Sequence, residues 1–136
     1  MGLPWAFVTT KILFMCPHSA AKSVAAAGFM TREAAKRGLD VEVSNGGTDP
    51  DPEVAAGVRS HLEAEGLPVV DPPSYVTAED LEQADVAVNI GCDLSHLAVS
   101  RAVEDWVIPD FSDDVDAAFA AIKDHVGALA DRLASS

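Results

Sequence analysis

Hydrophobic residues along the chain alternate between two spacings, which predict short strands followed by amphipathic helices. Residues 11–15 read Lys-Ile-Leu-Phe-Met, a run typical of a strand that is buried on both faces. Residues 23–37 place apolar side chains at helical spacing and are followed by Gly38, a common helix stop. The predicted strands cover residues 11–15, 41–44, 85–90 and 106–108. The predicted helices cover residues 23–37, 53–65, 94–103 and 115–133, and a short helix follows the capping box that begins at Thr77.

This order of elements predicts an α/β fold with a four-stranded parallel sheet and helices on both of its faces. We expect a single domain over residues 11–136, with residues 1–10 as an N-terminal extension. Ligands of such sheets bind beyond the carboxyl ends of the strands. Three candidate chemical groups follow predicted strand ends, namely Cys16, Cys92 and Asp110.

The segment between the first strand and the first helix, residues 16–23, begins with a thiol and ends with Lys-Ser. Its N–H groups and the helix N-terminus suit an anion, and the same dipoles favour the nucleophilic thiolate of Cys16. Lys22 adds a positive charge for a tetrahedral oxyanion, and Ser23 can donate a hydrogen bond to the sulfur. The alternative reading is that Cys16 is a small buried hydrophobe at a strand end. The candidate oxyanion-binding residues are Pro17, His18, Ser19, Ala20, Ala21 and Lys22.

Charge is unevenly distributed in this 136-residue chain, whose formal net charge is −13. Residues 1–37 carry five basic side chains and one acidic one, whereas the rest carries four basic and 21 acidic ones. The acidity argues against nucleic-acid and anionic-membrane partners and favours a small anion over an acidic macromolecule as substrate. With two cysteines and no leader-like or membrane-spanning run, we expect a cytoplasmic location.

Residues 16–23 resemble the phosphate-binding loop of the low-molecular-weight protein tyrosine phosphatase and arsenate reductase superfamily: Cys, five residues, Arg, then Ser or Thr. Three later segments resemble this family in the same order. Residues 45–50 are similar to its Ser-Ala-Gly-Thr-Glu-Pro turn, residues 77–89 to its Thr-x-Glu-x-x-x-x-Ala-Asp stretch, and residues 104–110 to the segment that carries its general acid. The resemblance implies the family's fold, with Cys16 as nucleophile and Asp110 as general acid.

Two details of the resemblance favour the arsenate reductase branch. His18 matches a Cys-x-His form of the loop, and Gly91-Cys92 resembles the Met-Gly-Cys turn that supplies a second, redox-active thiol. The resemblance therefore implies attack of Cys16 on arsenate, completed by Cys92 or by an external thiol such as a low-molecular-weight thiol or a redoxin. The alternative is that Cys92 is an inert residue at a strand end.

Departures from the family pattern keep two other functions open. Lys22 stands where the family has Arg, and Ser19 where it has Asn. A lysine gives one point charge in place of a planar fork, and losing a charge-assisted hydrogen bond costs about 1.5–3 kcal/mol, or roughly ten- to a hundred-fold in rate. The first alternative is a phosphatase that uses a Cys16 phosphoryl intermediate, with Tyr75 and Phe111 as candidate aromatics for an aryl phosphate. The second is a non-catalytic phosphate- or anion-binding homologue.

The histidines outside this loop show no spacing typical of metal ligands, and we expect neither a metal nor a cofactor. They are His61, His96 and His125.

Overall fold

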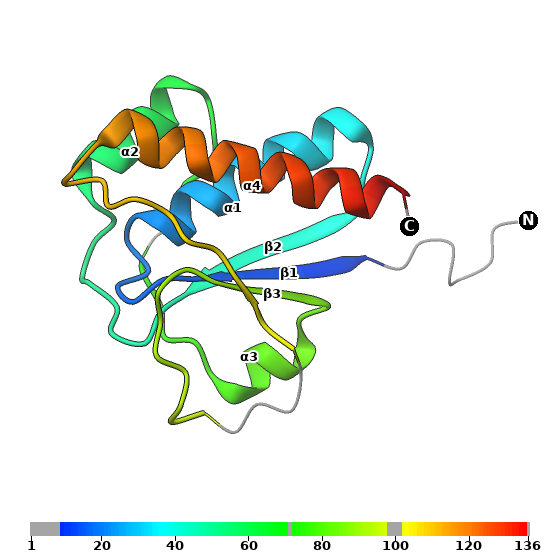
Figure 1. The fold of residues 1–136 in the computed structure, drawn as a ribbon, viewed down its shortest axis with the longest axis horizontal. Helices are drawn as coiled ribbons and strands as arrows, with labels where there is room; N and C mark the ends of the chain where they lie inside the picture. The colour runs from blue at the N-terminus through cyan, green and yellow to red at the C-terminus, as the bar shows by residue number, and fades with distance from the viewer. Residues whose placement is uncertain (1–8, 71, 98–101, 136) are drawn as a thin grey trace, which may run out of the picture.

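Four parallel strands form one sheet in the order β2-β1-β3-β4 in a computed structural model that describes residues 9–70, 72–97 and 102–135 (Figure 1). The predicted α/β architecture is confirmed. The strands are β1 (Thr10–Met15), β2 (Val41–Gly46), β3 (Val86–Asn89) and β4 (Glu104–Asp105). The helices are α1 (Lys22–Arg37), α2 (Ala56–Ala64), α3 (Ala78–Gln83) and α4 (Val115–Ser135).

The register of the central strand β1 brings three strand ends to one level. Met15 pairs with Gly46 of β2 on one side and with Asn89 of β3 on the other. Because all three strands run parallel, the residues that follow them emerge at the same edge of the sheet. The segments that begin at Cys16, Gly47 and Ile90 are therefore neighbours in space.

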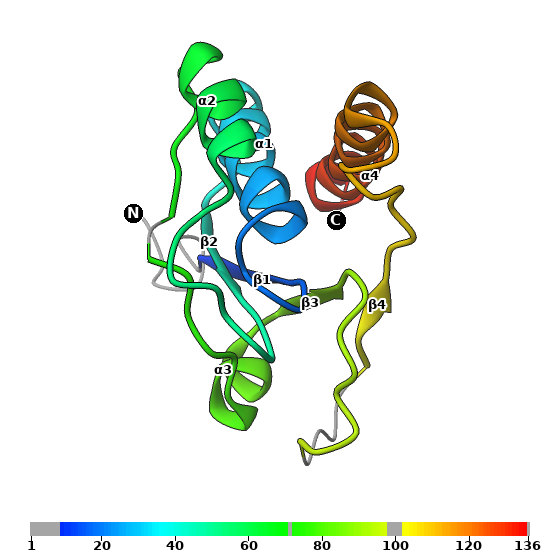
Figure 2. The ribbon, with the colours of Figure 1, turned by 90° about the vertical axis from the view of Figure 1, so that its left-hand side faces the viewer.

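Helices cover both faces of the sheet, as the sequence predicts. α1, α2 and α4 lie on one face and α3 lies on the other (Figure 2). Alternate side chains of β1 enter the two layers: Phe14 packs in the larger core with Phe29 and Ile122, whereas Met15 packs in the smaller one with Leu81. This explains the continuous apolar run of β1, since a strand that is covered on both faces has no solvent-facing positions.

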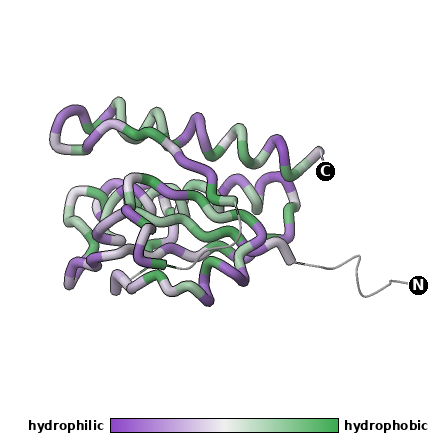
Figure 3. Tube along the Cα trace, turned by 60° about the horizontal axis from the view of Figure 1, so that its bottom comes forward, coloured by the Kyte–Doolittle hydropathy of each residue, from purple (hydrophilic) through white to green (hydrophobic). Residues whose placement is uncertain are grey.

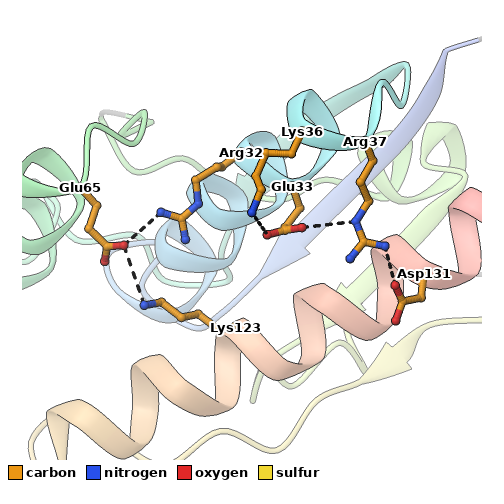
Figure 4. A network of polar contacts seen from close by, with 7 residues as sticks. All are labelled: Arg32, Glu33, Lys36, Arg37, Glu65, Lys123 and Asp131. Carbon is orange, nitrogen blue, oxygen red and sulfur yellow. Dashed lines mark hydrogen bonds and ion pairs between the residues drawn. The ribbon is translucent and has the colours of Figure 1, made fainter.

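α4 docks on α1 through one apolar face and a set of ion pairs. Hydrophilic and hydrophobic positions alternate along α4 (Figure 3). Glu65, directly after α2, contacts Arg32 of α1 at 3.0 Å and Lys123 of α4 at 3.8 Å, and Arg37 of α1 pairs with Asp131 of α4 (Figure 4). The three helices on this face are thus connected to one another by charge as well as by apolar packing.

The expected helix over residues 94–103 is wrong in the part that the structure describes. Residues 94–97 form a turn, in which the Asp93 carboxylate accepts a hydrogen bond from Ser95 N at 3.0 Å. Such a local side-chain bond competes with helix formation. Residues 102–103 are not helical either, and residues 98–101 lie outside the described residues.

The fourth strand and the second helix begin elsewhere than predicted. The fourth strand is Glu104–Asp105 rather than residues 106–108. These two residues pair with Val88 and Asn89 of β3, and the ladder ends with a hydrogen bond from Trp106 N to Asn89 O at 2.9 Å. The second helix begins at Ala56 rather than at residue 53, because the backbone of Ala55 is extended, with a ψ of 129°, and its N–H donates to Ala20 O.

In the described ranges, no helix is both long and apolar enough to cross a membrane. Residues 1–8 of the expected N-terminal extension lie outside these ranges, and its boundary after residue 10 stays a prediction.

Candidate active site

Two adjoining clefts open at the edge of the sheet where β1 and β3 end. The first, of about 480 Å³, is lined by Cys16, Lys22 and Asp110 among others. The second, of about 370 Å³, is lined by Cys92 together with residues of β4 and the segment after it. Lys22, Ile90 and Gly91 line both clefts. The structure thus gathers the three groups singled out at strand ends, with Cys16 and Asp110 in one cleft and Cys92 in the next.

The backbone of the Cys16 loop is held from outside by the segment that follows β2. Asp49 N donates to Pro17 O at 2.7 Å, Asp51 N to His18 O at 3.0 Å, and Ala55 N to Ala20 O at 2.9 Å. In a trans peptide, the C=O of one residue and the N–H of the next point in opposite directions. The N–H groups that follow Pro17 and Ala20 therefore point away from this segment, and no described residue accepts a hydrogen bond from them.

Gly47 lets this segment approach the loop closely. A Cβ atom at Gly47 would lie 2.5 Å from Cys16 O, 2.6 Å from Pro17 O and 2.9 Å from Ser19 N. All three are backbone atoms, so a side chain at this position would have to displace the loop itself.

Ser19 adopts a left-handed backbone conformation, with a φ of 52°. It is the only residue other than glycine with a positive φ in the described part of the chain. This conformation is uncommon for a serine, and the buried side chain is fixed by a 2.7 Å contact between Ser19 Oγ and Asn45 Oδ1. The loop is therefore formed in spite of the replaced asparagine.

The Cys16 thiol is buried and lies at the N-terminus of α1. Its Sγ is 3.1 Å from Ser23 Oγ, and Ser23 N donates to it at 3.4 Å. Both contacts come from the first turn of the helix, where backbone N–H groups lack intrahelical acceptors and favour negative charge.

Lys22 is directed toward the rim of the cleft and is paired there. Its Nζ donates to Asp110 Oδ1 at 2.7 Å and to Ile108 O at 3.1 Å. This hydrogen bond, and then the positive charge of Lys22, lower the pKa of Asp110 below its usual value. Both this pairing and its 66% exposed side chain favour the carboxylate form of Asp110.

Cys92 is half-buried and fixed by Asn89. Asn89 Oδ1 accepts from Cys92 N at 2.8 Å, and Asn89 Nδ2 donates to Cys92 O at 3.0 Å. Burial raises the pKa of the Cys92 thiol, and the negative charge of Cys16 raises it further, whereas a hydrogen bond from Thr48 lowers it.

The two candidate aromatic residues have different positions. Phe111 lines the Cys16 cleft, whereas Tyr75 is exposed and does not. Three residues that hold the Cys16 loop or Cys92 in place were not identified as site residues from the sequence, namely Asn45, Gly47 and Asn89. The one feature of the sequence that they share is their position at the ends of β2 and β3. Within residues 9–70, 72–97 and 102–135, no three His, Cys, Asp or Glu side chains are grouped so that they could hold a metal ion.

Comparison with known proteins gives a family and several similar folds. The model of the low molecular weight phosphotyrosine protein phosphatase family matches residues 11–135. Among curated proteins, none matches the sequence significantly.

Three solved structures illustrate the similarity of fold. The thioredoxin-dependent arsenate reductase of Corynebacterium glutamicum is 23% identical with a TM-score of 0.77, covering 92% of this chain, which spans only 62% of that protein. The arsenate reductase of Archaeoglobus fulgidus is 25% identical with a TM-score of 0.72, over 88% of this chain and 98% of the other. The low molecular weight phosphotyrosine phosphatase of Vibrio cholerae is 20% identical with a TM-score of 0.71, over 90% and 95%.

Proposed function

The chain belongs to the low molecular weight phosphotyrosine protein phosphatase family, and from this premise we propose that it is an arsenate reductase with Cys16 as nucleophile and Cys92 as second thiol. The observation that carries the proposal is the placement of two thiols in adjoining clefts that share Lys22, Ile90 and Gly91. A phosphatase mechanism has use for the first thiol only, whereas a reduction by two electrons needs two.

The first step binds arsenate over the Cys16 loop. The N–H groups of His18 and Ala21, the N-terminus of α1 and Lys22 supply positive potential for the oxygens. The Cys16 thiolate attacks arsenic, an S–As bond forms, and one arsenate oxygen leaves as water after it gains protons.

The second step reduces the arsenic. The Cys92 thiolate attacks Cys16 Sγ, an S–S bond forms, the S–As bond breaks and its electron pair stays on arsenic, which leaves as arsenite. An external dithiol, such as a redoxin of the kind used by the Corynebacterium protein, then returns two electrons to the disulfide. Gly91, directly before Cys92, has a φ of 90° and provides a turn that other residues rarely adopt.

The state of Asp110 supports this choice. A phosphatase needs an acid that gives a proton to the alkoxide or phenoxide leaving group, whereas the hydrogen bond from Lys22 lowers the pKa of Asp110 and so opposes its protonation. Arsenate carries exchangeable hydroxyls of its own, so its departing oxygen depends less on a general acid.

The test is arsenate reduction by the purified chain, with a thioredoxin system and, in parallel, with low-molecular-weight thiols. We expect Cys16→Ser to abolish reduction with every donor and Cys92→Ser to abolish reduction with thioredoxin. Peptide mapping after a single turnover without donor should find a Cys16–Cys92 disulfide. No arsenite with any donor, or full thioredoxin-dependent activity of Cys92→Ser, would contradict the proposal.

A phosphatase is the second candidate, favoured by the position of Asp110 and Phe111 in the Cys16 cleft. Hydrolysis of p-nitrophenyl phosphate that is lost in Cys16→Ser and unchanged in Cys92→Ser would select it. Phosphate or arsenate binding in calorimetry without either reaction would select the non-catalytic anion binder, for which the pairing of Lys22 with Asp110 and Ile108 O is the supporting observation.

A further inference from the structure

Behind the Cys16 loop, four buried side chains form a continuous chain of polar contacts. Ser19 Oγ lies 2.7 Å and Ser23 Oγ 3.5 Å from Asn45 Oδ1, and Ser23 Oγ lies 3.1 Å from Cys16 Sγ. Ser19 and Ser23 are completely buried, and Asn45 is 7% exposed. Solvent is therefore a poor source of partners. Apart from Ser74 N, which donates to Ser19 Oγ at 3.4 Å, these groups form their hydrogen bonds with one another.

One atom of this chain lacks a partner. Asn45 Nδ2 is buried and finds no acceptor among the described residues, while Oδ1 faces both serine hydroxyls. A buried amide N–H without an acceptor is costly. Rotation of the side-chain amide by half a turn exchanges Oδ1 and Nδ2 with little change in packing, and its two N–H donors then face the two serine oxygens.

The two orientations of Asn45 correspond to two protonation states of Cys16. With a thiol, S–H donates to Ser23 Oγ, and the Ser23 hydroxyl donates to Asn45 Oδ1. A thiolate can only accept, so the Ser23 hydroxyl must turn to the sulfur. It then no longer donates to Asn45, and Ser23 Oγ can accept a hydrogen bond from the amide nitrogen of Asn45 instead.

We propose that Asn45 is a positioning residue for the Cys16 nucleophile: its amide nitrogen turns toward Ser19 and Ser23 when Cys16 is a thiolate, and so directs the Ser23 hydroxyl to the sulfur. The role of Cys16 as nucleophile rests on the proposed function, whereas the orientation of Asn45 is measurable without it. The sequence is consistent with such a pair, because Ser19 stands where the family has Asn and Asn45 stands where the family turn begins with Ser. The same two side-chain types occupy exchanged positions.

Asn45→Asp is the decisive variant, because a carboxylate has the shape of the amide but only accepts hydrogen bonds. It should fix the Ser23 hydroxyl toward residue 45 and away from the sulfur. The readout is the pH midpoint for alkylation of Cys16 by iodoacetamide, followed by mass spectrometry in a Cys92→Ser background, where one thiol remains. The added charge alone would also raise this midpoint, so the test requires a double-mutant cycle with Ser23→Ala.

In the background that keeps Asn45, Ser23→Ala should raise the midpoint by about one pH unit, because the thiolate loses a hydrogen bond to a charged acceptor. In the Asn45→Asp background, Ser23→Ala should change it by less than about 0.3 units, because that bond is already absent. Asn45→Ser, which keeps a donor, should preserve the effect of Ser23→Ala. Equal shifts with Asn45 and with Asn45→Asp would overturn the proposal.

A measurement on the otherwise unaltered Cys92→Ser chain covers the case in which Asn45→Asp fails to fold. Above the alkylation midpoint, the side-chain amide protons of Asn45 should give nuclear Overhauser effects to the Hβ protons of Ser19 and Ser23, and their absence would overturn the proposal. Neither experiment uses arsenate. A chain that passes them but reduces no arsenate would refute the proposed function alone, and a reductase that fails them would refute the role of Asn45 alone.

Discussion

Lys22 Nζ lies 2.7 Å from Asp110 Oδ1, so the cation that takes the place of the family arginine is paired across the mouth of the Cys16 cleft. The same ammonium donates to Ile108 O at 3.1 Å. An entering anion must therefore compete with a carboxylate for Lys22. This pair connects the two unusual features of the site, a lysine in the loop and a general-acid candidate that is held ionised.

Removing the charge of Lys22 should raise the pKa of Asp110. The hydrogen bond from Lys22 and its charge lower the pKa of Asp110, so Lys22→Met should raise this pKa toward the usual value of an aspartate. Carboxyl ¹³C NMR titration of Asp110 measures this shift. Lys123→Met, which removes a charge that pairs with Glu65 instead, is the control and should leave Asp110 unchanged.

The ion pair between Lys22 and Asp110 should stabilise the folded protein at neutral pH and lose this effect in acid. A carboxylate whose pKa is lowered by folding stabilises the folded state above its unfolded pKa, and this contribution is lost as the pH falls through the lowered value. The difference in stability between wild type and Lys22→Met should thus be present above about pH 4 and disappear in stronger acid. A difference that grows as the pH falls would contradict the pairing.

Lys22→Arg should increase activity, because the guanidinium has five donors and can serve Asp110 and an oxyanion at once. One additional charge-assisted hydrogen bond in the transition state corresponds to about a ten- to hundred-fold gain in kcat/KM. The measurement is arsenate reduction, or p-nitrophenyl phosphate hydrolysis if that is the active reaction. Lys36→Arg, on an exposed part of α1 beside Glu33, should have no effect. Unchanged activity in Lys22→Arg would mean that Lys22 does not limit the rate.

The grouping of Cys16, Cys92 and Asp110 could be predicted from the sequence. Each follows a predicted strand, and the carboxyl ends of parallel strands lie at the same edge of the sheet. The partner of Lys22 could not be predicted, since it lies 88 residues away in the chain. The buried supporting residues were missed for a related reason. Asn45 and Asn89 act through contacts set by strand register, and an isolated asparagine in a loop sequence is equally typical of a turn.

Local bonding explains the errors in the elements themselves. Periodicity favours a helix over residues 94–103, but the Asp93 side chain bonds Ser95 N and directs the chain into a turn. The apolar residues 106–108 read as a strand because Trp106 and Ile108 are buried. Their burial comes from packing beside the sheet, where Trp106 contacts Phe14 with ring centroids 5.5 Å apart, and Val107 between them is 88% exposed.

Gly47→Ala should distort the Cys16 loop, because the new Cβ would lie within 2.9 Å of three of its backbone atoms. Overpacking of this kind costs about 1–3 kcal/mol, and we expect the free energy of unfolding to fall by that amount together with a loss of arsenate or phosphate binding. Gly127→Ala in α4 is the matched control, because nothing lies within 4 Å of its Cβ position. That variant should gain about 0.5–1 kcal/mol from helix propensity. Urea unfolding and anion calorimetry measure both effects, and normal anion binding by Gly47→Ala would refute the close approach.

Glu65→Gln should loosen the docking of α4 on α1 and α2. The carboxylate contacts Arg32 at 3.0 Å and Lys123 at 3.8 Å (Figure 4), and its pKa is lowered, first of all by the hydrogen bond from Arg32. We expect a loss of about 0.5–1 kcal/mol at pH 7. Because the pKa is lowered by folding, the loss should be present above about pH 4.5 and vanish at lower pH. Glu63→Gln, two residues earlier, is the control for removal of one surface charge.

Thr48→Val should make the Cys92 thiol harder to ionise. Burial raises the pKa of Cys92, and the hydrogen bond from the Thr48 side chain opposes this effect. Valine keeps the shape of threonine but has no hydroxyl, so the pKa of Cys92 should rise further. Iodoacetamide alkylation against pH, in a Cys16→Ser background that leaves one thiol, measures the change.

Thr48→Ser keeps the hydroxyl and is the matched control, which should titrate like the Cys16→Ser parent. In the full chain, a less ionised Cys92 slows its attack on Cys16 Sγ, since the thiolate is the attacking form. Thr48→Val should therefore reduce thioredoxin-dependent arsenate turnover while the rate of Cys16 alkylation stays unchanged. If turnover falls to the same extent in Thr48→Ser, the hydroxyl of Thr48 is not what prepares the second thiol.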